Sequence, residues 1–187
     1  MNTREKIVKL ARREILKVGY KGFSFHDISS PLRIKNAAVH YYFPTKEDLG
    51  LEVIDNEIQR FISWFEDMAD LSHWQKLEAF FELYDGKLTD EQMCMVGSLC
   101  SSYFSVTENI QAKLKEMMDH IKNWLSGLLA EGSEEGSFSF IGSANDKALV
   151  ILTSLAAGVQ MARAVDEDYF TPLKHQLRLE LNINSHE

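Results

Sequence analysis

Residues 23–49, FSFHDISSPLRIKNAAVHYYFPTKEDL, decide the fold of this chain. Ser24 and Asp27 stand three residues apart, and Thr45 and Asp48 repeat that spacing further along. A hydroxyl and a carboxylate at this spacing each satisfy a free backbone N–H group at the start of a helix, which is the capping-box arrangement. The stretch therefore predicts two helix starts, and the second of them opens a long helix.

A compact helical segment, residues 35–41, is predicted between these two helix starts. It combines small side chains with hydrogen-bond donors. Small residues allow the backbone to approach a DNA groove closely, while amide, imidazole and phenol groups reach base edges or phosphates. The stretch therefore predicts a helix-turn-helix that reads duplex DNA.

Four short motifs follow one another within residues 3–53. They are Gly19-Tyr20, Ser24 with Asp27-Ile28, Val39-His40-Tyr41-Tyr42-Phe43, and Pro44-Thr45-Lys46-Glu47-Asp48-Leu49. In these motifs the chain resembles the TetR family of transcriptional regulators (TetR/AcrR type). The resemblance implies an all-α fold of about nine helices. A three-helix helix-turn-helix DNA-binding domain, residues 1–46, would precede a helical effector-binding and dimerisation domain, residues 47–187.

The resemblance and the side-chain chemistry together indicate which residues meet DNA. We expect four residues to face the bases, namely Asn36, Ala37, Ala38 and His40. We expect five others to hold phosphates, namely Lys35, Tyr41, Tyr42, Thr45 and Lys46. The chain departs from the family at Arg33, because the family usually has glycine in that turn and glycine adopts left-handed backbone angles without steric cost. It also has His40 where the family often has tyrosine.

Charge is distributed unevenly along the 187 residues, whose net charge is −8. Residues 1–50 carry ten Lys/Arg against five Asp/Glu, which gives +5, and the remainder carries ten against twenty-three, which gives −13. A basic N-terminal part on an acidic body is typical of a module that binds a polyanion, although charges also segregate on solvated faces by chance.

The body of the chain is predicted to be helical throughout. We expect helices at residues 3–18, 46–68, 73–83, 90–104 (with Thr89 as its cap), 108–131, 144–166 and 172–181, and a loop at 132–137. The segment from 148 to 165 is apolar on nearly all sides and must be buried. By the resemblance, the last two helices form a homodimer interface with their copies.

Large apolar side chains in the body suggest a cavity for a small apolar or aromatic effector. The predicted ligand-binding residues are Phe61, Trp64, Phe65, Tyr84, Tyr103, Met117 and Trp124. Most such side chains are ordinary core, and spacing does not show which of them line a cavity. Cys94 lies in a motif resembling one TetR subgroup, which makes it a potential redox or electrophile sensor. The plainer interpretation of Cys94 is a small core residue.

Together these features predict a TetR-type regulator, a repressor that binds a palindromic operator as a homodimer and is released by its effector. The alternative is a helical adaptor that has lost specific DNA binding, which the missing turn glycine would explain. The six histidines lack metal-ligand spacing, and no phosphate loop or nucleophile elbow is present, so we expect no enzyme, no cofactor and no metal. Two cysteines and no membrane-spanning segment indicate a cytoplasmic protein without membrane contact.

Overall fold

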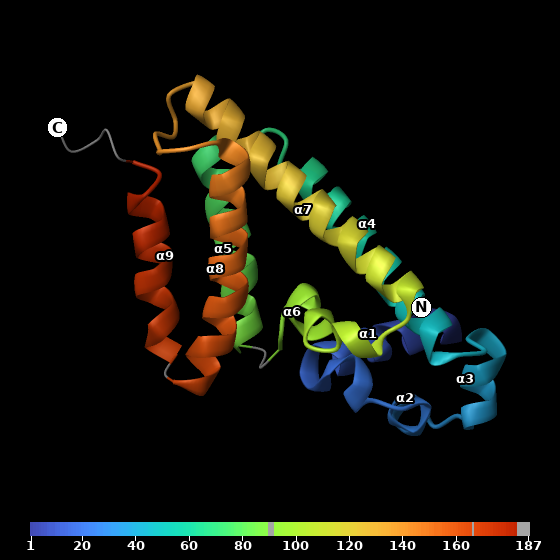
Figure 1. Ribbon diagram of the computed structural model, residues 1–187. Helices are drawn as coiled ribbons and strands as arrows, with labels where there is room; N and C mark the ends of the chain where they lie inside the picture. The colour runs from blue at the N-terminus through green and yellow to red at the C-terminus, as the bar shows by residue number, and fades with distance from the viewer. Residues whose placement is uncertain (90–91, 166, 183–187) are drawn as a thin grey trace. The chain divides into compact units, whose positions relative to one another are not determined.

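The computed structural model describes residues 1–89, 92–165 and 167–182, and this part of the chain is almost entirely helical (Figure 1). Within it, the one extended pairing is an isolated bridge between Ser139 and Asn182. The helices of the described residues are α1 (Thr3–Gly22), α2 (Phe25–Leu32), α3 (Asn36–Tyr42), α4 (Lys46–Asp67), α5 (His73–Thr89), α6 (Met95–Cys100), η1 (Tyr103–Ser105), α7 (Glu108–Glu134), α8 (Ala144–Ala164), η2 (Glu167–Tyr169) and α9 (Phe170–Leu179). The predicted all-α fold of about nine helices is therefore confirmed.

The chain divides into two compact units. Unit 1 consists of residues 1–61 and 94–118, and unit 2 consists of residues 62–93 and 119–187. Unit 1 therefore contains all of α1, α2, α3 and α6, together with most of α4 and the start of α7. The domain boundary between residues 46 and 47 that the sequence suggested stays a prediction.

Helix α1 begins at a complete capping box and changes direction near its end. The side-chain oxygen of Asn2 accepts the backbone N–H of Glu5 at 2.9 Å, and the Glu5 carboxylate accepts the backbone N–H of Asn2 at 3.0 Å. Gly19 has φ +81°, a left-handed value that glycine tolerates, and it kinks the helix. Val18, next to this kink, is 48% exposed.

The core of unit 1 lies under α1, α2, α3 and α4. Its apolar side chains are buried and include Ile7, Ile15, Ile28, Val39, Phe43 and Leu49. One ion pair lies beside them, in which Nε and Nη2 of the half-buried Arg12 donate to the carboxylate of the buried Glu57 at 2.5 and 2.9 Å. This bond raises the pKa of Arg12 and fastens α1 to α4.

The helix predicted at residues 90–104 is wrong in its start and its length. Thr89, the expected cap, is instead the last residue of α5, which continues past the expected end at residue 83. Asp90 lies outside the described residues. The next helix, α6, begins only at Met95, where the sulfur of Cys94 accepts the backbone N–H of Gly97 at 3.2 Å. A cysteine occupies the cap position here instead of the usual Ser, Thr, Asp or Asn, so the sequence did not indicate that a helix begins at this point.

The loop predicted at residues 132–137 is partly wrong, because α7 continues to Glu134. Gly132 suggested a break in the helix. In the structure it provides space instead, since a Cβ atom at this position would stand 2.4 Å from the ring of Phe138. The backbone N–H of Phe138 also donates to the carbonyl of Gly132 at 2.9 Å, which folds the following segment back onto the helix.

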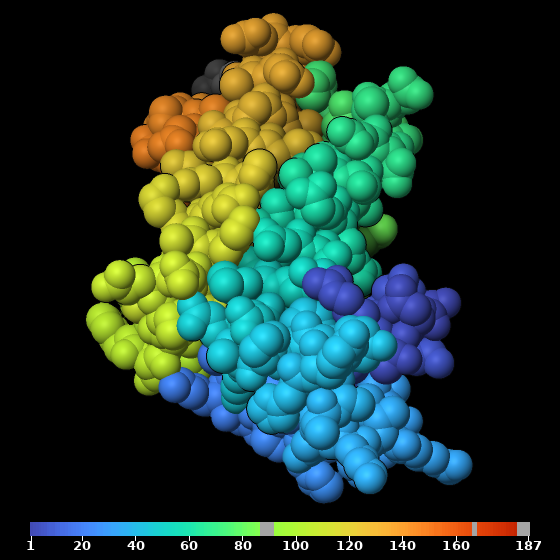
Figure 2. All heavy atoms as spheres, turned by 90° about the vertical axis from the view of Figure 1, so that its right-hand side faces the viewer, coloured from blue at the N-terminus to red at the C-terminus, as the bar shows by residue number. Residues whose placement is uncertain are grey.

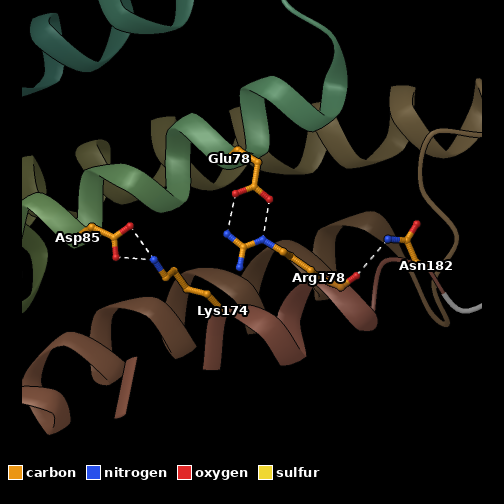
Figure 3. A network of polar contacts seen from close by, with 5 residues as sticks. All are labelled: Glu78, Asp85, Lys174, Arg178 and Asn182. Atoms are coloured by element: carbon orange, nitrogen blue, oxygen red, sulfur yellow. Dashed lines mark hydrogen bonds and ion pairs between the residues drawn. The ribbon is translucent and has the colours of Figure 1, made fainter. Parts of the chain in front are cut away.

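In unit 2, α8 contacts both α5 and α9 (Figure 1). Two ion pairs tie α9 to α5, as Figure 3 shows. Lys174 donates to both carboxylate oxygens of Asp85 at 2.5 and 2.6 Å, and Arg178 binds Glu78 through two bonds of 2.6 Å. The bond to Glu78 raises the pKa of Arg178. These contacts hold α9 in a fixed register along α5.

Candidate nucleic-acid interface

Helices α2 and α3 form the helix-turn-helix that the sequence predicted. The carboxylate of Asp27 accepts both the backbone N–H and the hydroxyl of Ser24 at 2.7 Å, so α2 has the expected capping pair. These hydrogen bonds lower the pKa of Asp27. The second expected pair is also present, because Asp48 accepts the backbone N–H of Thr45 at 2.9 Å where α4 begins.

The turn between α2 and α3 is closed by backbone hydrogen bonds around Arg33. This residue has φ +55° and ψ +39°, the left-handed region. Its N–H donates to the carbonyl of Ser30 at 3.0 Å, and the N–H of Ile34 donates to the carbonyl of Ser29 at 3.1 Å. This pair of bonds is the Schellman ending of a helix, in which glycine normally occupies the left-handed position.

Helix α3 buries Val39 and turns polar groups outward. Six of the nine predicted DNA-binding residues are exposed on or beside this helix and are called the reading surface here, namely Lys35, Asn36, Ala37, His40, Tyr41 and Tyr42. Ala38 is half-buried, and Tyr41 is 82% exposed. In Figure 2 the light-blue atoms around α3 are open to the viewer.

Contacts behind the reading surface orient two of its side chains. The buried hydroxyl of Ser29 donates to the side-chain oxygen of Asn36 at 2.5 Å, which leaves the Asn36 NH₂ group to donate outward. The Nδ1 atom of His40 lies 3.2 Å from the carbonyl oxygen of Pro44, and its ring packs edge-on against Phe25 at 4.6 Å between centroids. A carbonyl only accepts, so Nδ1 carries the hydrogen and Nε2 faces away.

Lys46, one of the predicted phosphate contacts, is held inside unit 1. Its Nζ atom donates to the carbonyl of Phe23 at 2.5 Å and lies 4.2 and 5.1 Å from the ring centroids of Phe23 and Tyr20. Partial burial, followed by the charge of Lys21, lowers the pKa of Lys46. Thr45 is exposed at the start of α4.

Helix α6 and the start of α7 brace this domain within unit 1. The buried hydroxyl of Ser98 on α6 donates to the carbonyl of Ile15 on α1 at 2.5 Å. Glu47, at the start of α4, accepts from the side chains of Thr107 and Asn109 at 2.8 and 2.9 Å. Sequence reasoning missed these contacts, since nothing local indicates that a serine or a glutamate will meet a partner sixty or more residues away.

The residues predicted to bind an effector are divided between the two units. Trp64, Phe65, Tyr84 and Trp124 form one aromatic cluster in unit 2, which Phe80 completes. The rings of Phe65 and Trp124 are stacked with centroids 4.3 Å apart. The remaining three belong to unit 1, where Met117 is buried, Phe61 is half-buried and Tyr103 is 41% exposed.

Helices α8 and α9 leave large apolar side chains exposed. These residues are called the C-terminal surface here, namely Leu149, Val150, Met161 and Leu179, exposed between 41% and 48%, with Val165 at 68% between the two helices. On the buried side, α9 lies so close to α8 that a Cβ atom on Gly158 would stand 2.3 Å from Leu173. Helix α8 therefore has one side that is tightly packed and another that exposes apolar side chains.

The described residues lack two other kinds of site. They contain no group of three or more His, Cys, Asp or Glu side chains arranged to hold a metal ion. No helix among them has both the length and the apolar character needed to cross a bilayer.

The comparisons with known proteins agree with the helix-turn-helix. Residues 7–53 match the model of the bacterial regulatory proteins, tetR family. A TetR transcriptional regulator from Legionella pneumophila is 30% identical, with a TM-score of 0.88, and the match covers 97% of this chain and 98% of that one. A TetR family regulator from Agrobacterium tumefaciens is 23% identical, with a TM-score of 0.89 and 95% and 97% coverage. An uncharacterised HTH-type transcriptional regulator in the lacX 3' region of Lactococcus lactis subsp. lactis is 25% identical over 166 residues, which are 80% of this chain and 83% of that protein.

Proposed function

The chain belongs to the TetR family of transcriptional regulators, and from this premise we propose that it represses transcription as a homodimer bound to a palindromic operator. A small apolar or aromatic effector releases it. The observation that carries the proposal is the reading surface, a short helix that exposes donors while its single buried residue, Val39, anchors it to the core.

The roles of the nine predicted DNA-binding residues follow from their side-chain chemistry. Asn36 and His40 face base edges, and Ala37 and Ala38 let the backbone approach them. Lys35, Tyr41, Tyr42, Thr45 and Lys46 hold phosphates, and the free N–H groups at the start of α4 add a site for an anion. Because the Lys46 ammonium lies on the carbonyl of Phe23 in the free protein, it has to exchange that bond for a phosphate.

The C-terminal surface supports the homodimer. Leu149, Val150 and Met161 recur at helical spacing on one side of α8, and contiguous exposed apolar groups mark an interaction site. Two copies related by a two-fold axis would present two reading surfaces to half-sites about one helical turn, roughly 34 Å, apart. Gln160 and Arg163 lie at the rim of this interface.

The effector is proposed to bind at the aromatic cluster. Phe65, Trp124 and Trp64 offer flat apolar faces to an apolar or aromatic molecule. An effector shifts the equilibrium only if it binds one arrangement of the dimer better than the other. A molecule retained during purification and identified by mass spectrometry tests this proposal, since adding it back should release the DNA. A retained molecule without effect on DNA binding contradicts it.

Cys94 supports a second route of release, by an electrophile. It is partly exposed, and its sulfur accepts the backbone N–H of Gly97 at the start of α6. N-ethylmaleimide, to which a thiolate adds directly, should release DNA from the native protein. Cys94→Ser keeps an oxygen acceptor at the cap and should resist, whereas the matched Cys100→Ser should respond as the native protein does. Equal release from both variants contradicts a role for Cys94.

A gel shift at two salt concentrations separates this proposal from its alternative, a helical adaptor. The probes are the DNA upstream of the chain's own coding region and a scrambled duplex. We expect a shift specific to the upstream DNA that weakens steeply with salt, because phosphate contacts release counterions. A protein that stays monomeric, or that binds no duplex even at low salt, would contradict the proposal and favour the adaptor.

A further inference from the structure

Arg33 is an outlier of the backbone. Among the described residues it is the one non-glycine residue with positive φ, at +55°. Only the backbone of Arg33 takes part in closing the turn, through its N–H bond to Ser30. A glycine would make the same bond without the steric cost that a Cβ atom brings in this region. The steric cost of the Arg33 side chain therefore indicates that the side chain has a role of its own. Residues held in such conformations cluster at functional sites.

Arg33 also differs from the other arginines near it. Residues 1–50 contain four arginines, and three of them bind carboxylates. Arg4 pairs with Glu52 at 2.6 Å, Arg12 with Glu57 at 2.5 Å and Arg13 with Glu14 at 2.9 Å. Arg33 is exposed, and the described residues offer its guanidinium no hydrogen bond or ion pair. Its five donors are free to bind an external oxyanion.

Arg33 is adjacent to the reading surface in the chain. Lys35 follows two residues later, so the two Cα atoms are at most about 7 Å apart. A planar guanidinium binds a phosphate through two parallel hydrogen bonds, which a lysine ammonium does not do.

We propose that Arg33 is a phosphate-binding residue beside the reading surface, which binds the DNA backbone at the edge of the groove that α3 enters. This inference rests on the proposed function. Arg33 keeps the left-handed turn at a higher steric cost than glycine would, and in return the protein gains one additional contact with DNA. In this interpretation the departure from the family's glycine strengthens DNA binding, whereas the adaptor alternative treats it as a loss.

The test compares three variants on a duplex that the native protein selects from a random library. Arg33→Gly and Arg33→Asn keep a residue that tolerates the turn and remove the cation. Both should reduce the slope of log K against log salt by about 0.9, so that the loss of affinity between 50 and 200 mM salt becomes about 3.5-fold smaller than in the native protein. Arg33→Lys should keep the slope but bind more weakly, since the two-bond geometry is lost.

Thermal stability provides a second measurement, which should change in the opposite direction to DNA affinity. Arg33→Gly relieves the strained turn, so its Tm should rise by about 1–4 °C while its DNA binding weakens. The matched control is Arg60→Gln, which removes an exposed arginine from α4, fourteen residues and about 21 Å along that helix from Lys46. It should leave the salt slope unchanged.

Three results would overturn the inference, namely an unchanged slope in Arg33→Gly, an equal change of slope in Arg60→Gln, or a lower Tm in Arg33→Gly. Failure of the proposed function has a different signature, since the native protein would then select no duplex. A duplex that the native protein and Arg33→Gly bind with the same slope overturns the role of Arg33 alone.

Discussion

The reading surface and the C-terminal surface are both exposed, yet they are built in opposite ways. Around α3 the exposed side chains are amide, imidazole and phenol groups, and buried partners such as Ser29 hold them in place. On α8 the exposed side chains are Leu149, Val150 and Met161, whose apolar groups have no preferred direction. Oriented donors suit a polyanion with a fixed pattern of acceptors, whereas an apolar stripe suits another protein surface.

Breaking the C-terminal surface should have the largest effect. The double variant Val150→Glu/Met161→Glu places two carboxylates where two copies are proposed to meet, so the protein should become monomeric. One reading surface then acts alone, and affinity for the operator should fall by about 10²- to 10⁴-fold. Light scattering and a gel shift measure the two results.

The control Phe104→Glu changes an apolar side chain that is 97% exposed in unit 1 and should leave both the oligomeric state and the operator affinity unchanged. A dimeric double variant would contradict the proposed interface.

The ion pair of Arg12 and Glu57, between α1 and α4, should give the next largest effect. Glu57→Gln leaves the half-buried Arg12 without its counter-charge, which should cost about 3 kcal/mol of unfolding free energy and lower Tm by about 6–12 °C. Glu52→Gln makes the same substitution on the same helix pair, but its partner Arg4 is largely exposed, so the cost should stay below about 1 kcal/mol. Thermal melts compare them. Equal losses of unfolding free energy in the two variants would mean that burial does not determine how much each ion pair stabilises the fold.

Asn36 tests whether the reading surface distinguishes bases. Asn36→Ala removes an amide that Ser29 orients, so discrimination between the selected duplex and one with a single altered base pair should fall by about 1–3 kcal/mol at that position. Titrations of both duplexes measure it. A uniform loss of affinity for both would show that Asn36 positions the protein on DNA and reads no base.

Lys46 tests a conflict between sequence and structure. If its ammonium leaves the Phe23 carbonyl for a phosphate, Lys46→Ala should weaken binding to every duplex and reduce the salt slope by about one. If it stays, the same variant should lower Tm and leave the slope unchanged. The two readouts, slope and Tm, therefore separate a DNA contact from an internal one.

The sequence predicted local features well and tertiary ones poorly. The capping pairs at Ser24 and Thr45 were predictable because each depends on two residues three positions apart. The brace from Ser98 to Ile15 was not, because it joins residues far apart in the sequence. Gly132 gave a wrong prediction because it leaves space for the ring of Phe138, and this packing contact outweighs the preference of glycine for a loop.

Tyr20 gives the smallest expected effect at neutral pH, and it tests how closed the interior of unit 1 is. Burial, followed by the charges of Glu47 and Asp48, raises its pKa to about 12. The unfolded chain ionises Tyr20 near its ordinary pKa of 10.0, so the stabilisation is complete below pH 10 and is lost as the pH rises towards 12. Tyr20→Phe has no phenol to ionise and should lose less stability over that range, while its Tm at pH 7 changes little. Chemical denaturation at pH 8, 10 and 11.5 measures the difference. Parallel declines of the unfolding free energy in both proteins would mean that water reaches the Tyr20 hydroxyl, so that the interior of unit 1 is not closed to solvent.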